Sequence, residues 1–139
     1  MSYLVDSNVL SELMRPAPAR QVVAWLDRHY AECWTSTIVI LEVERGIARM
    51  ADENRRVALR AVSERLFDRF GPRIVVFDRR CASMGAELVG VCRKAGRDLK
   101  LGDAAIAGVA GVYDQILVTR NTGDFEKTGL SLVNPWDAA

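Results

Sequence analysis

Cysteine and histidine are scarce in this sequence of 139 residues. Its three cysteines, Cys33, Cys81 and Cys92, are an odd number, lie far apart and form no Cys-x-x-Cys motif. A disulfide framework and a thiolate metal site are therefore disfavoured, and a reducing cytoplasm suits the chain best. The single histidine, His29, gives little support to a His-rich zinc site or to a histidine general base.

The sequence also lacks an excess of one charge and a long apolar segment. Its formal net charge is +1, so the overall charge does not indicate a polyanionic partner. No segment approaches the roughly 18 consecutive apolar residues that cross a bilayer, and no signal-type segment begins the chain. We therefore expect a cytoplasmic protein with no membrane partner.

Two nucleotide-binding motifs are missing. No G-x-G-x-x-G follows the first apolar run and no P-loop occurs, so a hydride-transfer enzyme and an NTPase are disfavoured. A signalling receiver domain would carry an acidic pair after its first strand and a lysine after its last. This chain has Asp6-Ser7 and Asn134-Pro135-Trp136 there, which counts against a receiver despite Asp78 after the third expected strand.

Strand-like and helix-like segments alternate along the chain. The expected strands are short and apolar: Tyr3–Val5, Cys33–Ser36, Ile74–Phe77, Gln115–Thr119 and Leu130–Val133. After a first helix that Pro16 ends, the expected helices are Gln21–Tyr30, Ile38–Met50, Asp52–Phe70, Arg79–Ala95 and Ala104–Tyr113. This alternation predicts an α/β fold with a parallel sheet between helical layers. Without repeats, low-complexity segments or linkers, residues 1–139 are expected to form one domain.

Polar residues at the starts of the helices can cap them. We expect Ser7 or Asn8 to cap the first helix, Asp78 to cap the helix after the third strand, and Asp103 to begin the next helix. The Ile74–Phe77 strand is nearly all β-branched or aromatic, so we expect both of its faces to be buried.

Four acidic residues fall at one edge of the expected sheet. Asp6 and Asp124 follow strands, Glu42 lies in the first turns of a helix after a strand, and Asp103 begins a helix. In a parallel sheet these positions share the carboxyl edge, where ligands bind. Carboxylates within a few Å of one another repel, so they demand a raised pKa or a cation. A hard divalent ion such as Mg²⁺ resolves the repulsion and leaves room for phosphate oxygens.

Each acid also has a simpler explanation. Asp6 and Asp103 can cap helices, and Glu42 taken alone is most readily a solvated helix residue. Asp124 lies in a glycine-containing turn, where aspartate is common. The prediction of a metal site therefore depends on the four residues together.

Four segments, in chain order, carry a family resemblance. They are Leu4–Glu12, Thr35-Ser36 followed by Glu42, Gly102–Ala107 and Val118–Phe125. Together they resemble the signature blocks of PIN-domain ribonucleases, and most closely the VapC toxins of bacterial toxin–antitoxin pairs in their FitB-like branch. The resemblance spans essentially the whole chain. It implies a PIN-like three-layer α/β/α domain with a central, mainly parallel five-stranded sheet.

The resemblance also implies a site and a reaction. The four acids would be a catalytic quartet that holds Mg²⁺ or Mn²⁺, and Asn8, Thr119 and Asn121 would support the quartet by hydrogen bonds. The metal would lower the pKa of a water, and the hydroxide would attack an RNA phosphodiester. The main alternative is a catalytically silent PIN module in a DNA-bound repressor complex, which the presence of all four acids disfavours.

Basic residues before Asp103 are candidate RNA contacts. They are Arg93, Lys94, Arg97 and Lys100. They can hold phosphates beside the metal, but the dipole of a helix C-terminus favours cations equally well, so both explanations stay open.

Apolar residues near the start of the chain are candidate antitoxin contacts. They are Val9, Leu10, Leu13, Val22 and Trp25. The toxins that this chain resembles bind a VapB-like antitoxin in a helical groove and form homodimers. They meet operator DNA only through the antitoxin complex. We expect the same partners here.

Overall fold

The centre of the molecule is a parallel sheet with its first strand in the middle. The computed structural model describes residues 1–137, which contain a five-stranded sheet in the order β3-β2-β1-β4-β5. The strands are β1 (Tyr3–Val5), β2 (Cys33–Ser36), β3 (Ile74–Val75), β4 (Ile116–Val118) and β5 (Leu132–Val133). All neighbouring pairs are parallel, which confirms the expected sheet. Residues 138 and 139 of the predicted domain lie outside the described residues.

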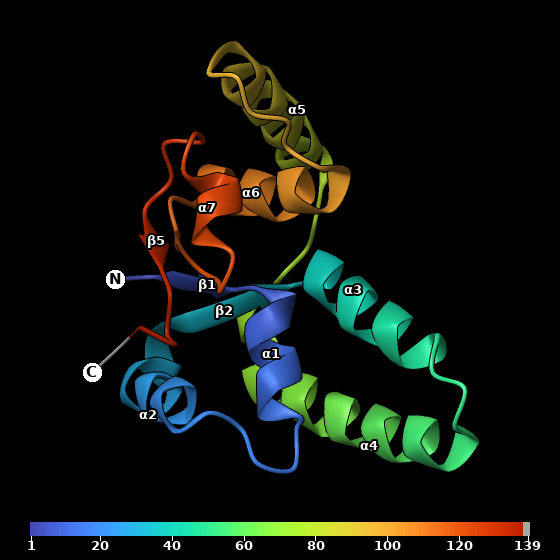
Figure 1. Cartoon of the computed structure of the whole chain (residues 1–139). Helices are drawn as coiled ribbons and strands as arrows, with labels where there is room; N and C mark the ends of the chain where they lie inside the picture. Colours follow the sequence, from blue (N-terminus) through green and yellow to red (C-terminus); the bar gives the residue numbers. More distant parts are fainter. Residues whose placement is uncertain (138–139) are drawn as a thin grey trace.

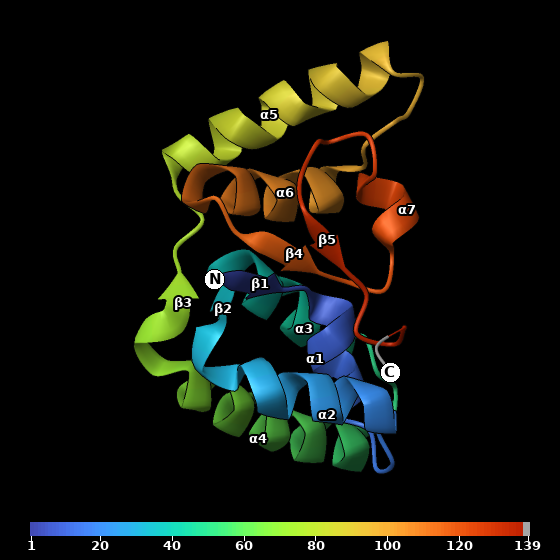
Figure 2. The same ribbon diagram turned by 90° about the vertical axis from the view of Figure 1, so that its left-hand side faces the viewer.

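Helices cover both faces of the sheet. Figure 1 shows α5, α6 and α7 on one side and α1 to α4 on the other, and Figure 2 shows β3 and β5 at opposite edges. The helices are α1 (Ser7–Leu13), α2 (Arg20–His29), α3 (Thr37–Ala48), α4 (Glu53–Phe70), α5 (Arg79–Lys94), α6 (Leu101–Tyr113) and α7 (Thr122–Phe125), with short 3-10 helices at Tyr30–Glu32 and Gly71–Arg73. The predicted three-layer α/β/α architecture is confirmed. Within residues 1–137, no helix is both long and apolar enough to cross a membrane.

The burial of the inner strands β1 and β4 holds the residues that follow them in a defined position. Leu4 and Val5 of β1 and Leu117 and Val118 of β4 are fully buried. This is the pattern of a parallel strand covered on both faces, and each such side chain contributes roughly 1.5–3 kcal/mol to folding. The carboxyl ends of β1 and β4 therefore lie at a firmly held edge of the sheet.

The third strand differs from its prediction. β3 ends at Val75, and Val76 is 62% exposed, so the expectation that Ile74–Phe77 is buried on both faces is wrong. The reason is position: β3 is an edge strand, and the chain leaves the sheet there to reach α5 (Figure 2). Asp78 caps α5 as predicted, since its Oδ1 accepts from the Cys81 N–H at 3.1 Å.

Two helices begin earlier than expected. Asp6, and not Ser7 or Asn8, caps α1. α6 begins at Leu101, because the Ala104 N–H already donates to the Lys100 carbonyl at 2.8 Å. Asp103 therefore lies within the first turn of α6. The glycine-containing turn expected at Asp124 contains the single-turn helix α7, which ends at Phe125.

α5 and α6 cross so closely that glycine is required at the contact. A Cβ added to Gly108 of α6 would lie 2.2 Å from the Cys81 carbonyl oxygen and 2.9 Å from the Gly85 nitrogen of α5. Both are backbone atoms, so no side-chain rotation can relieve the overlap. The α5–α6 pair is therefore held at a spacing that only glycine permits.

Replacing Gly108 with alanine is expected to lower the free energy of unfolding by about 2 kcal/mol, because the added methyl forces two helices apart. For a chain of this length that is a fall of about 6 °C in the thermal midpoint, measured by calorimetry. Gly90→Ala on α5 is the control: its Cβ meets nothing within 4 Å, so it should raise the midpoint slightly. Equal midpoints for Gly108→Ala and the unsubstituted chain would contradict the steric argument.

Candidate active site

The four acids of the predicted quartet lie on different elements at the carboxyl edge of the sheet. Asp6 follows β1, Glu42 is in the second turn of α3, Asp103 is in the first turn of α6, and Asp124 is in α7. A Cβ added to Gly102, the neighbour of Asp103, would lie 3.4 Å from Glu42 Oε2. The packing of α3 against α6 thus brings two of the acids together.

Asp6 is the most enclosed of the acids. Its carboxylate accepts hydrogen bonds from the Ser7 backbone N–H at 2.7 Å, from the Thr119 hydroxyl at 2.8 Å and from the Asn8 amide at 3.4 Å. Burial raises the pKa of Asp6, although the hydrogen bonds from Thr119 and Ser7 oppose that rise. The carboxylate is therefore fixed in orientation at the end of β1.

Asn8 and Thr119 join the ends of β1 and β4. The Asn8 amide donates to the Thr119 hydroxyl at 3.1 Å, and Asn8 Oδ1 accepts from the Arg120 N–H at 3.2 Å. The predicted support of Asp6 by Asn8 and Thr119 is consistent with these contacts. Asn121 takes part through its backbone, since its N–H donates to the Thr119 hydroxyl at 3.2 Å.

Glu42 and Asp103 are held in a negative environment. Burial, and then the charges of Asp6 and Asp103, raise the pKa of Glu42 to about 7. Burial, and then the charges of Asp124 and Asp6, raise the pKa of Asp103. Among the described residues, the buried Glu42 Oε1 has no hydrogen-bond partner. The four carboxylates therefore interact electrostatically, and a cation among them would relieve their repulsion.

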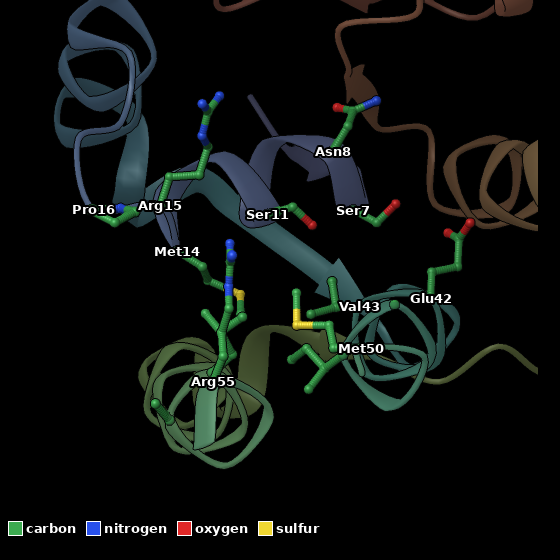
Figure 3. A pocket seen from close by; sticks show the side chains of 14 residues that line it. Ser7, Asn8, Ser11, Met14, Arg15, Pro16, Glu42, Val43, Met50 and Arg55 are labelled. Carbon is green, nitrogen blue, oxygen red and sulfur yellow. The ribbon is translucent and has the colours of Figure 1, made fainter. Parts of the chain in front are cut away.

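Ser7 is a site residue that the sequence reasoning treated only as a candidate cap. Its hydroxyl lies 3.5 Å from Asp6 Oδ1, and a hydrogen bond from the Ser7 side chain lowers the pKa of Glu42. Figure 3 shows Ser7, Asn8 and Glu42 at the same end of a pocket. The sequence feature that could have identified Ser7 is its position directly after Asp6, at the first residue of α1.

Asp124 is bound by an arginine of the same chain. The Arg97 guanidinium donates to Asp124 Oδ1 at 2.6 Å, and the two side chains are 40% and 44% exposed. The cation that Asp124 contacts is thus supplied by the chain itself. Within residues 1–137, no group of three or more acidic, histidine or cysteine side chains is already arranged as the ligands of a metal ion.

The other three predicted RNA contacts flank Arg97 in the sequence. Arg93 and Lys94 are exposed in the last turn of α5, where the helix dipole also favours cations. Lys100 immediately precedes α6, and together with Arg97 it lowers the pKa of Asp103 against the larger opposing effects. Arg97 and Lys100 are thus the two of the four that act on the acids directly.

The predicted antitoxin contacts are mostly core residues, so that prediction is wrong for four of the five. Val9, Leu10 and Val22 are fully buried and Trp25 is 6% exposed. Helical periodicity identified their apolar face correctly, but the chain's own sheet and helices cover it. Only Leu13 keeps a partly exposed side chain.

An apolar surface that is accessible to a partner lies between α1, α3 and α4. A pocket of about 680 Å³ runs from Glu42, Ser7 and Asn8 toward α4 (Figure 3). Its apolar lining is Met14, Val43, Ile47, Met50, Ala58 and Leu59, with Arg15 and Arg55 at the far end. Met14 also lines a second hollow of about 470 Å³ between α1, α2 and α4, which includes Leu13, Arg65 and Arg69. We call the two together the apolar groove.

Comparisons with known proteins give a consistent result. The family described as "PIN domain" matches residues 3–130. Plasmid stability protein StbB from Pseudomonas syringae is 39% identical over 137 residues, covering 97% of this chain and 99% of that protein. VapC ribonuclease Y4jK from Sinorhizobium fredii is 30% identical, covering 98% and 99%. Toxin FitB from Neisseria gonorrhoeae is 31% identical, covering 96% and 97%.

Solved structures agree with the sequence comparisons. FitAcB from Neisseria gonorrhoeae has a TM-score of 0.89 at 31% identity, covering 97% of this chain and 99% of that chain. FitAB bound to an IR36 DNA fragment has a TM-score of 0.90 at 30% identity, covering 99% and 97%. At this coverage and TM-score the likeness extends over nearly the whole chain, including the sheet and its helices.

Proposed function

The chain belongs to the PIN domain family, and from that membership we propose that it is the toxin of a type II toxin–antitoxin pair, a metal-dependent endoribonuclease that hydrolyses RNA phosphodiester bonds. The observation that carries the proposal is the set of four carboxylates that follow β1 or lie on α3, α6 and α7. Within this set, the charges of Asp6 and Asp103 help to raise the pKa of Glu42, and those of Asp124 and Asp6 help to raise the pKa of Asp103. Similar proteins named a ribonuclease and a toxin support the same conclusion. An RNA substrate and a DNA-binding partner would place the protein in the cytoplasm.

The donor set fits Mg²⁺ or Mn²⁺. Hard divalent ions take carboxylate oxygens, and the buried Glu42 Oε1 still lacks a partner among the described residues. Asp6, Glu42, Asp103 and Asp124 would hold the ion. When bound, it would supply a nucleophile at neutral pH by acidifying water and would stabilise charge on the phosphate.

The chain's own residues would orient the reactants. Thr119 and Asn8 hold the Asp6 carboxylate in place through the bonds described above, and Ser7 stands between Asp6 and Glu42. Arg93, Lys94, Arg97 and Lys100 would bind RNA phosphates beside the acids, which fixes the position of the strand without reading its sequence.

The apolar groove is the surface we propose for the antitoxin. Its apolar lining begins beside the acids, so a segment bound there would also block access to them. Arg55, Arg65 and Arg69 line or flank the groove and favour a segment that carries acidic residues among its apolar ones. We propose that operator DNA is met only through this antitoxin complex, and that the toxin forms a homodimer.

The function is tested by incubating antitoxin-free protein with total RNA. We expect cleavage in the presence of Mg²⁺ or Mn²⁺, no cleavage in EDTA, and recovery when the ion is returned in excess. Gel electrophoresis of the RNA measures the outcome. Cleavage that persists in EDTA would contradict a metal mechanism, and no cleavage of any RNA would favour the silent module that acts only in a repressor complex.

A further inference from the structure

The Arg97–Asp124 ion pair joins the loop before α6 to α7. Arg97 lies in the loop between α5 and α6, and Asp124 lies in α7, 27 residues further along the chain. The nitrogen-to-oxygen distance of 2.6 Å is that of a strong charge-assisted hydrogen bond. One of the four carboxylates is thus engaged by a cation that belongs to the chain itself.

The backbone of Arg97 is held by a hydrogen bond, whereas its side chain is partly exposed. Gly96 has a φ of +81° at the end of α5, and the Arg97 N–H donates to the Cys92 carbonyl at 2.9 Å. Leu99, two residues later, is buried. The guanidinium, by contrast, is 40% exposed at the surface. The loop therefore aims Arg97 at the acids but leaves the side chain able to reach solvent or a ligand.

A metal ion and the guanidinium cannot both hold Asp124 without cost. The carboxylate would be shared between a divalent cation and a monovalent one only a few Å apart, and like charges at that distance repel. Lys100 already adds positive charge on the Asp103 side. An ion that takes Asp124 is therefore expected to displace Arg97.

We propose that Arg97 is a positioning residue that occupies Asp124 in the metal-free protein and passes to an RNA phosphate when a divalent ion takes that carboxylate. This inference rests on the proposed function of the site. A planar guanidinium fork suits phosphate as well as it suits carboxylate. Metal binding would thereby prepare the RNA contact.

Metal affinity tests the first half of the proposal. Calorimetric titration of antitoxin-free protein with Mn²⁺ alone should show about tenfold tighter binding to Arg97→Gln, because the competing cation is gone. Arg97→Lys keeps the charge and should stay within about threefold of the unsubstituted chain. Arg79→Gln removes an exposed charge at the start of α5, whereas Arg97 lies beyond the end of that helix. This variant should leave the Mn²⁺ affinity unchanged.

Unchanged or weaker Mn²⁺ binding by Arg97→Gln would overturn the inference. That result leaves the proposed function standing if the unsubstituted chain binds Mn²⁺. Failure of the unsubstituted chain to bind Mn²⁺ at all would overturn both. If Arg97 had only a structural role, Arg97→Gln would lower the thermal midpoint in EDTA and would not bind Mn²⁺ more tightly.

RNA binding tests the second half. Fluorescence anisotropy with a labelled single-stranded RNA is measured in Ca²⁺, with absence of cleavage checked on a gel, and again in EDTA. Arg97→Gln should weaken binding severalfold in Ca²⁺ only, and its salt slope there should fall by about one. Equal weakening in both conditions would make Arg97 a permanent phosphate contact and would contradict the exchange.

Discussion

Asp6→Asn is expected to reduce RNA cleavage about a thousandfold while the chain stays folded. Asp6 is the acid with the most complete set of hydrogen bonds and the least exposure, so a neutral side chain there removes a fixed metal ligand. Asparagine is also a good helix N-cap, which preserves the start of α1. Cleavage rates with Mg²⁺ and thermal midpoints in EDTA measure the two effects.

The metal-free stability of this variant should not fall. Burial raises the pKa of Asp6, so its negative charge disfavours the metal-free fold, and removing it costs nothing on that account. Asp78→Asn is the matched control, because Asp78 lies with Arg80 and Tyr113 at the opposite end of α6 from Asp103. The control should cleave within twofold of the unsubstituted rate. Full activity of Asp6→Asn would refute the quartet as the metal site.

Gly46→Trp is expected to weaken antitoxin binding about a hundredfold, because the indole would fill part of the apolar groove. Gly46 lines the groove on α3, and a Cβ there meets nothing within 4 Å, so the new side chain enters open space without disturbing the fold. The measurement is calorimetric titration with the product of the neighbouring gene, or co-purification of the two.

Gly46→Ala separates obstruction from backbone effects. Alanine should leave antitoxin affinity within about threefold and stabilise α3 by roughly 0.5–1 kcal/mol, since glycine is a poor helix former. If both variants bind the antitoxin as the unsubstituted chain does, the antitoxin uses another surface. If both lose binding equally, the conformation of α3 matters and the groove volume does not.

Much of the fold, and the position of the four acids at one edge of the sheet, could be predicted from the sequence. Short apolar strands alternating with helices lead to a parallel sheet, and in such a sheet the residues after β1 and β4 must share an edge. Asp6 and Thr119 are of this kind, and their direct hydrogen bond follows from that rule. The starts of helices were harder to predict, since α6 begins at Leu101 and the side chain of its N-cap residue, Lys100, makes no capping hydrogen bond.

The partner surface and the Arg97 contact could not be predicted in the same way. A helical period shows that Val9 in α1 and Trp25 in α2 each lie on the apolar side of their own helix, but it does not tell whether the chain itself or another protein covers that side. The sheet covers it here, and the accessible groove involves Met14 and Ile47 instead. Arg97 and Asp124 meet because the loop between α5 and α6 lies against α7, and no periodic pattern encodes such a contact.

A ribosome that has not yet reached Asp103 carries a chain in which the proposed site is incomplete. β1 is translated first, but its neighbour β4 and the Thr119 hydroxyl that holds Asp6 come 113 residues later. Two of the four acids are also supplied only by the last third of the sequence. Domains fold as units during synthesis, so the proposed site would stay incomplete until α7 is made. A prematurely terminated chain would then be no nuclease, and an antitoxin need meet only finished molecules.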